Sequence, residues 1–378
     1  MATNASTPMI HEQHPYSWYR TMRATSPVFF DETRQTWNVF LYADVERVLT
    51  DYTTFSSDLA RWQRGVSSLV TSDPPLHNQL RALVSQAFTP RSIIELTPRI
   101  REIVDQLLDQ VAPLGRMDVI QELAYPLPTI VISELLGVPR ADHVQLKDWV
   151  DAFVIAAGKG EHLPSSGSAM VTYFEQLTEQ RKRQPENDLI SRLVTARADG
   201  QQLSIEDVAG ICRLLFIAGY ETTTYLLGNS VQCFLQHPEV IEQLRSQPTL
   251  LPDAIEEVLR YHSPVHLQYR IVARDTEMGG QKLSEGQFIL PWIGSSGHDE
   301  TVFEQPERFD IYRKPNKHIA FGHGIHFCLG APLARLEAQI ALQALLERLP
   351  ALRLVEGAPL ERVQSLVVHG VKNLPVTF

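Results

Sequence analysis

Apolar residues recur at helical spacing along most of the chain, whereas segments of strand type are short. Beyond residue 90 the spacing predicts successive helices over 92–112, 118–136, 141–156, 166–184 and 187–198. Near the N-terminus, a short helix over 15–24 precedes two aromatic and β-branched runs within 28–40, which flank a polar turn and predict a hairpin. The C-terminal segment 365–378 predicts a second hairpin, with its turn near His369 and Gly370. The pattern therefore predicts a mainly α-helical fold with a smaller β region, an α+β protein.

One predicted helix is far longer than the others. Ser204 and Asp207 form a capping box that starts a helix, and no proline follows until Pro238. About 32 residues at ~1.5 Å each give a helix of roughly 48 Å, long enough to cross a domain. Its middle, A-G-Y-E-T-T-T at 218–224, is poorly suited to a helix, because glycine costs about 1 kcal/mol relative to alanine and each β-branched threonine somewhat less. A helix weakened at its centre indicates a functional role there.

Residues 321–330 read F-G-H-G-I-H-F-C-L-G, a run of three glycines and one cysteine. Glycines let the backbone turn tightly and approach a large ligand. A thiolate at Cys328 can bind iron, backbone N–H groups can hydrogen-bond its sulfur, and His326 can donate to an anionic haem propionate. The helix-forming sequence after Gly330 places Cys328 at a helix N-terminus, which lowers the pKa of a thiol.

Simpler interpretations of these residues exist. A lone cysteine is most often a small buried apolar residue. His323, His326 and Cys328 could form a zinc site, although structural zinc takes four ligands and the sequence has no C-x-x-C pair. In an ordinary helix, Glu221 would be exposed or ion-paired, and Thr222 would be a core threonine that donates back to the Ala218 carbonyl.

The run at 321–330 resembles the haem-binding loop of the cytochrome P450 family, F-x-x-G-x-(H/R)-x-C-x-G, at every fixed position. A-G-Y-E-T-T is similar to the family pattern A-G-x-(D/E)-T-T, with Glu for the commoner Asp. Glu257 and Arg260 match its E-x-x-R pattern, and Arg308 matches a later arginine. The resemblance spans about residues 15–378 and implies the P450 fold, a triangular prism-like molecule with haem b between the long helix and the Cys328 loop.

The resemblance also implies roles for individual residues. Cys328 would be the axial ligand of the haem iron, Glu221 and Thr222 would deliver protons to O2, and Glu257, Arg260 and Arg308 would form a structural triad. The remaining haem-binding residues would be His77, Arg81, Ala218, Arg270, Phe321, Gly322, His326 and Gly330. The residues expected to line a substrate pocket are Val265, His266, Leu267 and Gln268. Loops at 58–72 and 157–168 would cover that pocket.

Composition narrows the class of protein. Hydrophobic content of 44% and charged content of 21% are ordinary for a globular protein, and a net charge of −10 argues against nucleic-acid binding. Three cysteines with no short spacing do not form a disulfide framework. Without an apolar leader or an 18-residue apolar run, we expect a soluble, cytoplasmic protein with no membrane anchor. We expect one domain over 1–378, with a flexible N-terminus at 1–14.

The function implied is that of a monooxygenase, which inserts one oxygen atom from O2 into a C–H or double bond of an apolar small molecule. Fatty acids, terpenoids, steroids and macrolide-like compounds all remain possible substrates. Electrons would come from a ferredoxin and its flavin-dependent reductase, with Arg335 as a candidate docking contact, and the protein would be a monomer. The alternative is a non-catalytic haem-binding sensor or carrier, which would need Cys328 but not Glu221 and Thr222.

Overall fold

The computed structural model describes residues 15–59, 68–159, 165–198 and 201–378. The chain divides into two compact units built from interleaved segments. The sheet unit comprises residues 1–74, 253–328 and 362–369, and the helical unit comprises residues 75–252, 329–361 and 370–378. The single domain expected from the sequence stays a prediction.

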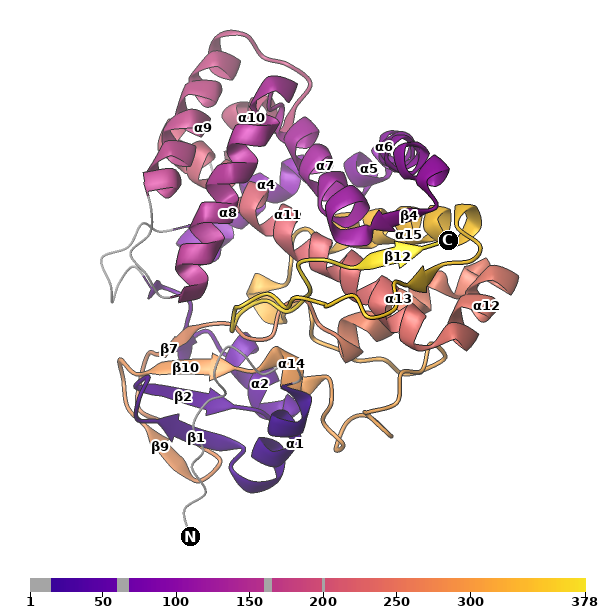
Figure 1. Cartoon of the computed structure of the whole chain (residues 1–378). Helices are drawn as coiled ribbons and strands as arrows, with labels where there is room; N and C mark the ends of the chain where they lie inside the picture. The colour runs from indigo at the N-terminus through magenta and orange to yellow at the C-terminus, as the bar shows by residue number, and fades with distance from the viewer. Residues whose placement is uncertain (1–14, 60–67, 160–164, 199–200) are drawn as a thin grey trace. The chain divides into compact units, whose positions relative to one another are not determined.

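A five-stranded sheet forms the centre of the sheet unit (Figure 1). Its order is β1 (Val28–Asp31), β2 (Thr36–Val39), β10 (Phe288–Pro291), β7 (Arg270–Val272) and β3 (Phe55–Ser56). β1 and β2 pair antiparallel, which confirms the predicted N-terminal hairpin. β2 and β10 pair in parallel, and about 250 residues of chain separate them. Such a separation is compatible with parallel pairing, because parallel neighbours cannot be joined by a tight turn and need a crossover connection.

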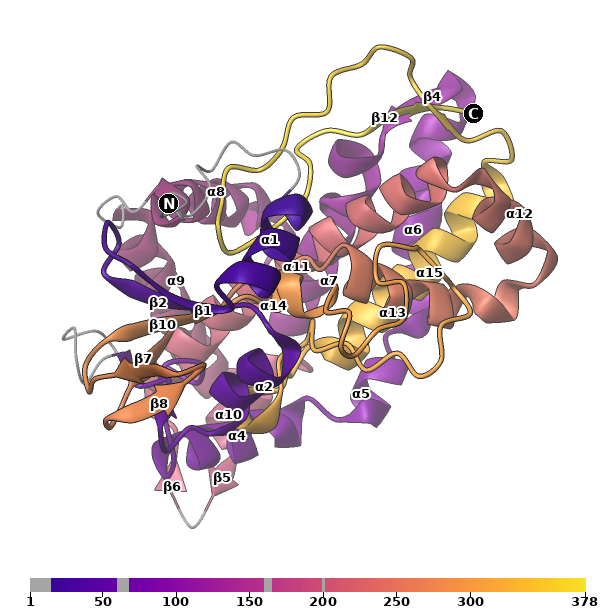
Figure 2. The same ribbon diagram turned by 90° about the horizontal axis from the view of Figure 1, so that it is seen from below.

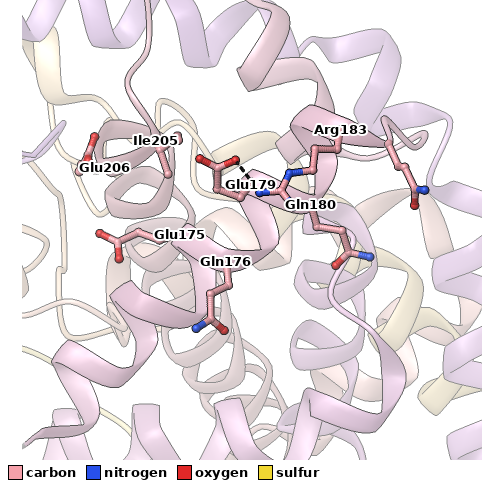
Figure 3. A pocket seen from close by; sticks show the side chains of 8 residues that line it. Glu175, Gln176, Glu179, Gln180, Arg183, Ile205 and Glu206 are labelled. Carbon is pink, nitrogen blue, oxygen red and sulfur yellow. Dashed lines mark ion pairs between the residues drawn. The ribbon is translucent and has the colours of Figure 1, made fainter.

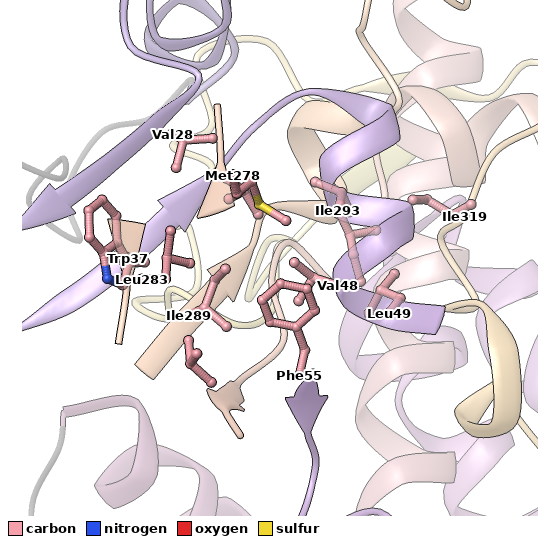
Figure 4. Packing of buried hydrophobic residues seen from close by; sticks show 13 residues of the cluster. Val28, Trp37, Val48, Leu49, Phe55, Met278, Leu283, Ile289, Ile293 and Ile319 are labelled. Atoms are coloured by element: carbon pink, nitrogen blue, oxygen red, sulfur yellow. The ribbon is translucent and has the colours of Figure 1, made fainter. Parts of the chain in front are cut away.

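Apolar side chains cover this sheet. Phe55, Ile289 and Ile293 pack with Val48 and Leu49 of the helix α2, Tyr42–Thr50 (Figure 4). Burial of each such side chain stabilises the fold by about 1.5–3 kcal/mol. A second cluster unites the aromatic and aliphatic side chains of Tyr19, Met22, Phe40, Leu267, Leu290 and Trp292. Together the two clusters fix the strands that carry residues of the candidate site.

The other elements of the sheet unit are short. They are α1 (Tyr16–Thr25), β8 (Thr276–Met278), β9 (Gln281–Leu283), α14 (Ile293–Ser296), η5 (Gly324–His326) and most of α13 (Leu251–Tyr261). α1 confirms the helix predicted at 15–24.

The helical unit is organised around α11, Ile205–Gln236, which confirms the predicted long helix. The Ser204 hydroxyl accepts from the Asp207 N–H at 3.1 Å, and the Asp207 carboxylate accepts from the Ser204 N–H at 3.1 Å. α11 packs against α7 (Pro126–Leu136), α9 (Ser165–Arg183) and α15 (Ala331–Arg348), and α15 lies along α6 (Thr97–Val111) (Figure 2).

Shorter elements surround these helices. The remaining helices are η1 (Ala112–Leu114), the π-helix η2 (Ile120–Ala124), η3 (Arg140–Asp142), η4 (Pro248–Leu250), α4 (Leu76–Ala87), α5 (Pro90–Ile94), α8 (His143–Lys159), α10 (Leu189–Thr195) and α12 (Pro238–Ser246). A small sheet has the order β11 (Arg353–Leu354), β12 (Pro375–Thr377), β4 (Arg116–Asp118), and a separate hairpin joins β5 (Arg197–Ala198) to β6 (Gln201–Gln202).

Three expectations about local structure differ from the fold. The helix predicted over 92–112 is two helices, because Pro98 lies in the first turn of α6 and cannot donate to a preceding turn. The segment 118–136 begins as β4 and η2, and α7 starts only at Pro126. The predicted C-terminal hairpin with its turn near His369 forms in part: the Lys372 N–H donates to the Glu361 carbonyl oxygen at 2.7 Å, so the segment folds back on itself, but Val368 pairs with Val265.

The two predicted lid loops lie only partly within the described residues. α8 extends to Lys159 and α9 begins at Ser165, so most of the predicted loop at 157–168 is helical, and residues 160–164 lie outside the described part. Residues 60–67 of the other loop also lie outside it. Among the helices that the structure describes, none combines the length and apolar character that crossing a bilayer requires.

Candidate functional site

Backbone hydrogen bonds hold the Cys328 loop in the sheet unit. The N–H of Cys328 donates to the carbonyl oxygen of Phe321 at 2.8 Å, and that of Phe327 donates to Gly324 at 3.1 Å. Gly322 and Gly324 adopt φ angles of +74° and +71°. A Cβ atom on Gly324 would lie 3.2 Å from the carbonyl oxygen of Leu49, so both its backbone conformation and its surroundings favour glycine. The loop therefore presents Cys328 from a defined backbone.

Cys328 differs from the other two cysteines in its exposure. It is half-buried, whereas Cys212 and Cys233 are fully buried within the helical unit. Burial raises the pKa of the Cys212 thiol, which suits a small apolar core residue. Two residues after Cys328, Gly330 is the N-cap of α15, whose N-terminal N–H groups favour negative charge. Cys328 is therefore the cysteine suited to bind a ligand as a thiolate.

The side chains around Cys328 fit a haem iron, most of whose ligands come from the porphyrin and not from the protein. Among the described residues, no group of three or more His, Cys, Asp or Glu side chains is placed to hold a metal ion. The zinc alternative at His323, His326 and Cys328 therefore gains no support, because such an ion needs three or four protein ligands. A single thiolate is sufficient for haem, whose porphyrin supplies four nitrogens.

Arg270, the first residue of β7, is suited to bind a carboxylate. Its side chain is buried, and burial lowers the pKa of its guanidinium to about 10, an effect that nearby Asp73 opposes. Its Nη1 donates to the carbonyl oxygen of Tyr269 at 2.8 Å. A guanidinium has five N–H donors, so further donors of this buried group can bind an anion such as a haem propionate.

The other expected propionate partners lie on two elements. His77 and Arg81 are one turn apart on α4 in the helical unit, as their spacing predicted, and His77 is buried. His326 lies in η5 of the sheet unit and is half-buried. Their binding to propionates stays a prediction.

The centre of α11 carries the polar side chains of Glu221 and Thr222 close to one exposed residue, Ala218. Ala218 is exposed, although its neighbours along the helix are buried or half-buried. Thr222 Oγ1 donates to the Ala218 carbonyl oxygen at 2.8 Å, which confirms the predicted back-bond. Tyr225 donates to Glu221 Oε1 at 3.1 Å. Burial is the main cause that raises the pKa of Glu221 to about 7, so this carboxyl group is poised to exchange a proton near neutral pH.

The structure corrects one member of the predicted triad. Glu257 and Arg260 are fully buried on α13 and form a bidentate ion pair, with N–O distances of 2.7 and 2.8 Å. The second guanidinium at Glu257 belongs to Arg313, whose Nε lies 3.2 Å from Oε1. The side chain of the predicted Arg308 is exposed, and only its carbonyl oxygen takes part, as an acceptor from Arg260 and Arg313.

The four predicted pocket residues fall into two groups. Leu267 is fully buried in the aromatic cluster with Trp292. His266 forms a 2.7 Å hydrogen bond with the hydroxyl of Tyr19. Packing within the sheet unit therefore occupies the side chains of His266 and Leu267. Val265 and Gln268 are half-buried, and their role in a pocket stays a prediction.

A surface hollow of about 750 Å³ lies in the helical unit between α9 and the first residues of α11 (Figure 3). Polar and charged side chains dominate its lining, which consists of Glu175, Gln176, Glu179, Gln180, Arg183, Gln184, Ile205 and Glu206. Pockets for apolar small molecules are lined mainly by apolar and aromatic side chains. This hollow is therefore not a candidate for the apolar substrate.

Comparisons with known proteins point to one family. A profile of the family described as Cytochrome P450 matches residues 132–357. The chain is 44% identical to the putative cytochrome P450 YjiB of Bacillus subtilis, covering 96% of this chain and 93% of that protein. It is 38% identical to the cyclomarin C epoxidase CymV of Salinispora arenicola, covering 96% and 95%. The crystal structure of CYP109E1 from Bacillus megaterium in complex with testosterone matches with 43% identity and a TM-score of 0.89, covering 96% of this chain and 99% of that one.

Proposed function

The chain belongs to the cytochrome P450 family, and from this premise we propose that it oxygenates a lipid-like apolar molecule with electrons from a separate ferredoxin and flavin-dependent reductase. Family membership makes it a haem b monooxygenase of small molecules that uses O2. The observation that carries the proposal is the Cys328 loop, because its glycine turns present one half-buried thiol at the start of a helix.

Support for a lipid-like substrate comes from relatives. The matched structures of CYP109E1 hold testosterone and corticosterone, and another matched structure, of P450BioI, holds a fatty acid carried on an acyl carrier protein. These ligands share a large apolar surface, and burial of such a surface drives binding in an apolar site. We therefore place steroids and long-chain fatty acids first among the substrate classes.

When bound, haem supplies the activation of O2 and the transfer of one oxygen atom to the substrate. The protein's residues would position this group and supply protons. The Cys328 thiolate would bind the iron, and its negative charge would be stabilised by the N-terminus of α15. Arg270 and His326 of the sheet unit, and His77 and Arg81 of the helical unit, would neutralise the propionates, and Ala218 would be a further haem-binding residue.

Glu221 and Thr222 would hold and move protons. The Thr222 hydroxyl donates its own proton to the Ala218 carbonyl, so its oxygen can accept a hydrogen bond from a neighbouring donor. The Glu221 carboxyl can supply a proton at neutral pH. Among the described residues, Glu257, Arg260 and Arg313 would fix the backbone that leads to the Cys328 loop and do no chemistry.

Electron supply by separate proteins is the family's usual arrangement in bacteria. Arg335, in the second turn of α15, stays a candidate contact for a ferredoxin. The non-catalytic alternative would have no use for the Glu221 and Thr222 pair. We accordingly keep the monooxygenase as the proposed function, with one polypeptide chain as the expected working unit.

The absorption spectrum of the purified holoenzyme, reduced and exposed to carbon monoxide, tests this proposal. A strongly red-shifted Soret band is expected for thiolate-ligated haem, and Cys328→Ser should abolish that band. Addition of testosterone or a long-chain fatty acid should shift the spin state of the ferric enzyme, and a ferredoxin with its reductase should then yield oxygenated product. A Soret band of the histidine-ligated type in the wild type would overturn the assignment of Cys328. Spin-state shifts without product under any electron supply would favour the sensor.

A further inference from the structure

Two threonine side chains bond back to the backbone at the centre of α11. Thr222 Oγ1 donates to the carbonyl oxygen of Ala218 at 2.8 Å. Thr224 Oγ1 donates to the carbonyl oxygen of Tyr220 at 2.9 Å. Each of these bonds competes with the N–H that the helix directs at the same carbonyl, and Gly219 makes the same turn more flexible. The centre of α11 therefore depends on contacts with other elements for its shape.

The two faces of this segment are packed differently. Ala218 is exposed and Thr222 is half-buried, and their spacing of four residues places them on one face of the helix. Tyr220 and Thr224, also four residues apart, are buried. Successive residues of a helix are rotated by about 100°, so Tyr220 lies about 200° around the axis from Ala218. The packed face that carries Tyr220 is therefore opposite to the face that carries Thr222.

A hydrogen bond from α8 anchors this packed face. The hydroxyl of Tyr220 donates to Oδ1 of Asp151 at 2.8 Å, and Nζ of Lys147 lies 2.9 Å from Oδ2 of the same carboxylate. Burial is the main cause that raises the pKa of Tyr220, so its hydroxyl keeps its proton and stays a donor. A hydrogen bond to a carboxylate is stronger than one between neutral groups. The bond from Tyr220 is thus suited to join α11 to α8.

The ring of Tyr220 is held as well as its hydroxyl. It meets the ring of Tyr125, the residue that precedes α7, edge to face with centroids 4.8 Å apart. The hydroxyl of Tyr125 lies 3.4 Å from both carboxylate oxygens of Asp151, and Lys147 Nζ lies 4.8 Å from the centroid of the Tyr125 ring. Ring packing and hydrogen bonding together therefore hold Tyr220 in one orientation.

We propose that Tyr220 and Asp151 are positioning residues for Thr222: their hydrogen bond fixes the packed face of α11 and thereby the direction in which the Thr222 face points. The inference rests on the proposed monooxygenase function, in which Thr222 handles protons, and adds two residues that act through it. Placement matters for such a group, because an error of about 1 Å can cost about 100-fold in rate.

The test is amide hydrogen–deuterium exchange of the ferric holoenzyme, followed by peptide. Tyr220→Phe removes the hydroxyl and keeps the ring against Tyr125. Exchange within residues 218–226 should rise about 10-fold, because a hydrogen bond to a charged group is lost there, whereas residues 228–236 of the same helix should keep their rates. Tyr173→Phe is the matched control. Its hydroxyl donates to Asp142 at the same 2.8 Å in the same unit, and its loss should leave residues 218–226 unchanged.

Variants of Asp151 show whether this acceptor is responsible. Asp151→Ala should reproduce the exchange of Tyr220→Phe, and Asp151→Asn, which keeps an acceptor oxygen, should retain most of the protection of wild type. The double variant Tyr220→Phe/Asp151→Ala should exchange no faster than the faster single variant, because both remove one bond. Additive increases would overturn the inference. If one single variant does not fold, the exchange profile of the other decides.

A second measurement distinguishes positioning from helix stability. In the reduced holoenzyme with carbon monoxide, the C–O stretching band responds to the polar groups next to the bound gas. Tyr220→Phe should shift or broaden this band, and Tyr173→Phe should not. An unchanged band, unchanged exchange, or a uniform rise in exchange along α11 would overturn the inference. The same samples give the Soret band. Absence of a thiolate-type band in wild type would overturn the proposed function itself, and its presence with any of those results overturns the inference alone.

Discussion

Thr222 Oγ1 and the carbonyl oxygen of Ala218 lie 2.8 Å apart, so the hydroxyl proton of Thr222 is committed to the backbone of α11. The oxygen of Thr222 therefore serves as an acceptor. Thr222→Ala should keep haem and substrate binding but divert reducing equivalents to hydrogen peroxide. The measurement compares product and peroxide with the NAD(P)H consumed. Thr222→Ser is the matched control and should stay largely coupled, whereas normal coupling in Thr222→Ala would remove Thr222 from proton delivery.

Gly324 and Gly280 have nearly the same backbone conformation but different surroundings. Alanine variants of the two therefore distinguish the cost of backbone strain from the cost of a steric clash. Gly324 and Gly280 have φ angles of +71° and +74°, so alanine costs about 1–2 kcal/mol at either position. A Cβ atom at Gly324 would lie 3.2 Å from Leu49 and Thr50 backbone atoms, whereas one at Gly280 would have open space. Gly324→Ala should therefore lose most of the thiolate-type carbon monoxide band, and Gly280→Ala should keep it. Equal bands in both variants would show that the loop tolerates displacement.

Arg313 and Arg308 offer a second matched pair. Arg313→Ala removes a guanidinium from buried Glu257 and should destabilise the protein by about 1–3 kcal/mol, although Arg260 still pairs with the carboxylate. Arg308→Ala removes an exposed side chain and leaves its carbonyl acceptor, so its effect should stay within about 0.5 kcal/mol. Urea unfolding followed by haem absorbance measures both. If Arg308→Ala destabilised the protein more than Arg313→Ala, the third member of the triad would be Arg308, as the sequence predicted.

Acid should destabilise the sheet unit through His266. Burial, with smaller effects of His298 and Arg362, lowers the pKa of His266 from 6.5 to about 3. Between these values the unfolded chain binds a proton that the folded chain excludes. The free energy of unfolding therefore decreases as the pH is lowered below 6.5, by up to about 1.4 kcal/mol per pH unit.

His266→Asn keeps an acceptor for Tyr19 and removes the titration. The free energy of unfolding of this variant should depend less steeply on pH between 6.5 and 5 than that of wild type. An unchanged slope in His266→Asn would mean that other groups cause the acid sensitivity.

Local patterns in the sequence were sufficient for several features. The capping box at Ser204 and the proline at 238 gave the bounds of α11, because both signals act within one helix turn. The pattern of glycines around Cys328 likewise predicted a tight loop, because each glycine determines the backbone only at its own position. The long helix, the N-terminal hairpin and the weakened centre at Thr222 all follow from near neighbours in the chain.

Features that depend on distant partners escaped prediction. Arg308 and Arg313 are five residues apart on an irregular segment, and only tertiary packing decides which guanidinium reaches Glu257. Val368 was assigned to a local hairpin, but its partner is Val265, about a hundred residues earlier. Lys147 and Asp151 have the spacing of a helical ion pair, yet the approach of Asp151 to Tyr220 of α11 leaves no trace in either local sequence.

The parallel pairing of β2 with β10 sets a minimum delay between synthesis and folding. Thr36 of β2 lies opposite Phe288 of β10, so the ribosome must add about 250 residues before the partner strand exists. Synthesis adds roughly 5–20 residues per second, so the edge of β2 that pairs with β10 stays unpaired for about 10–50 s. Throughout the delay that edge is open to pairing with other chains, so the hairpin of β1 and β2 is a point at which the nascent protein can aggregate.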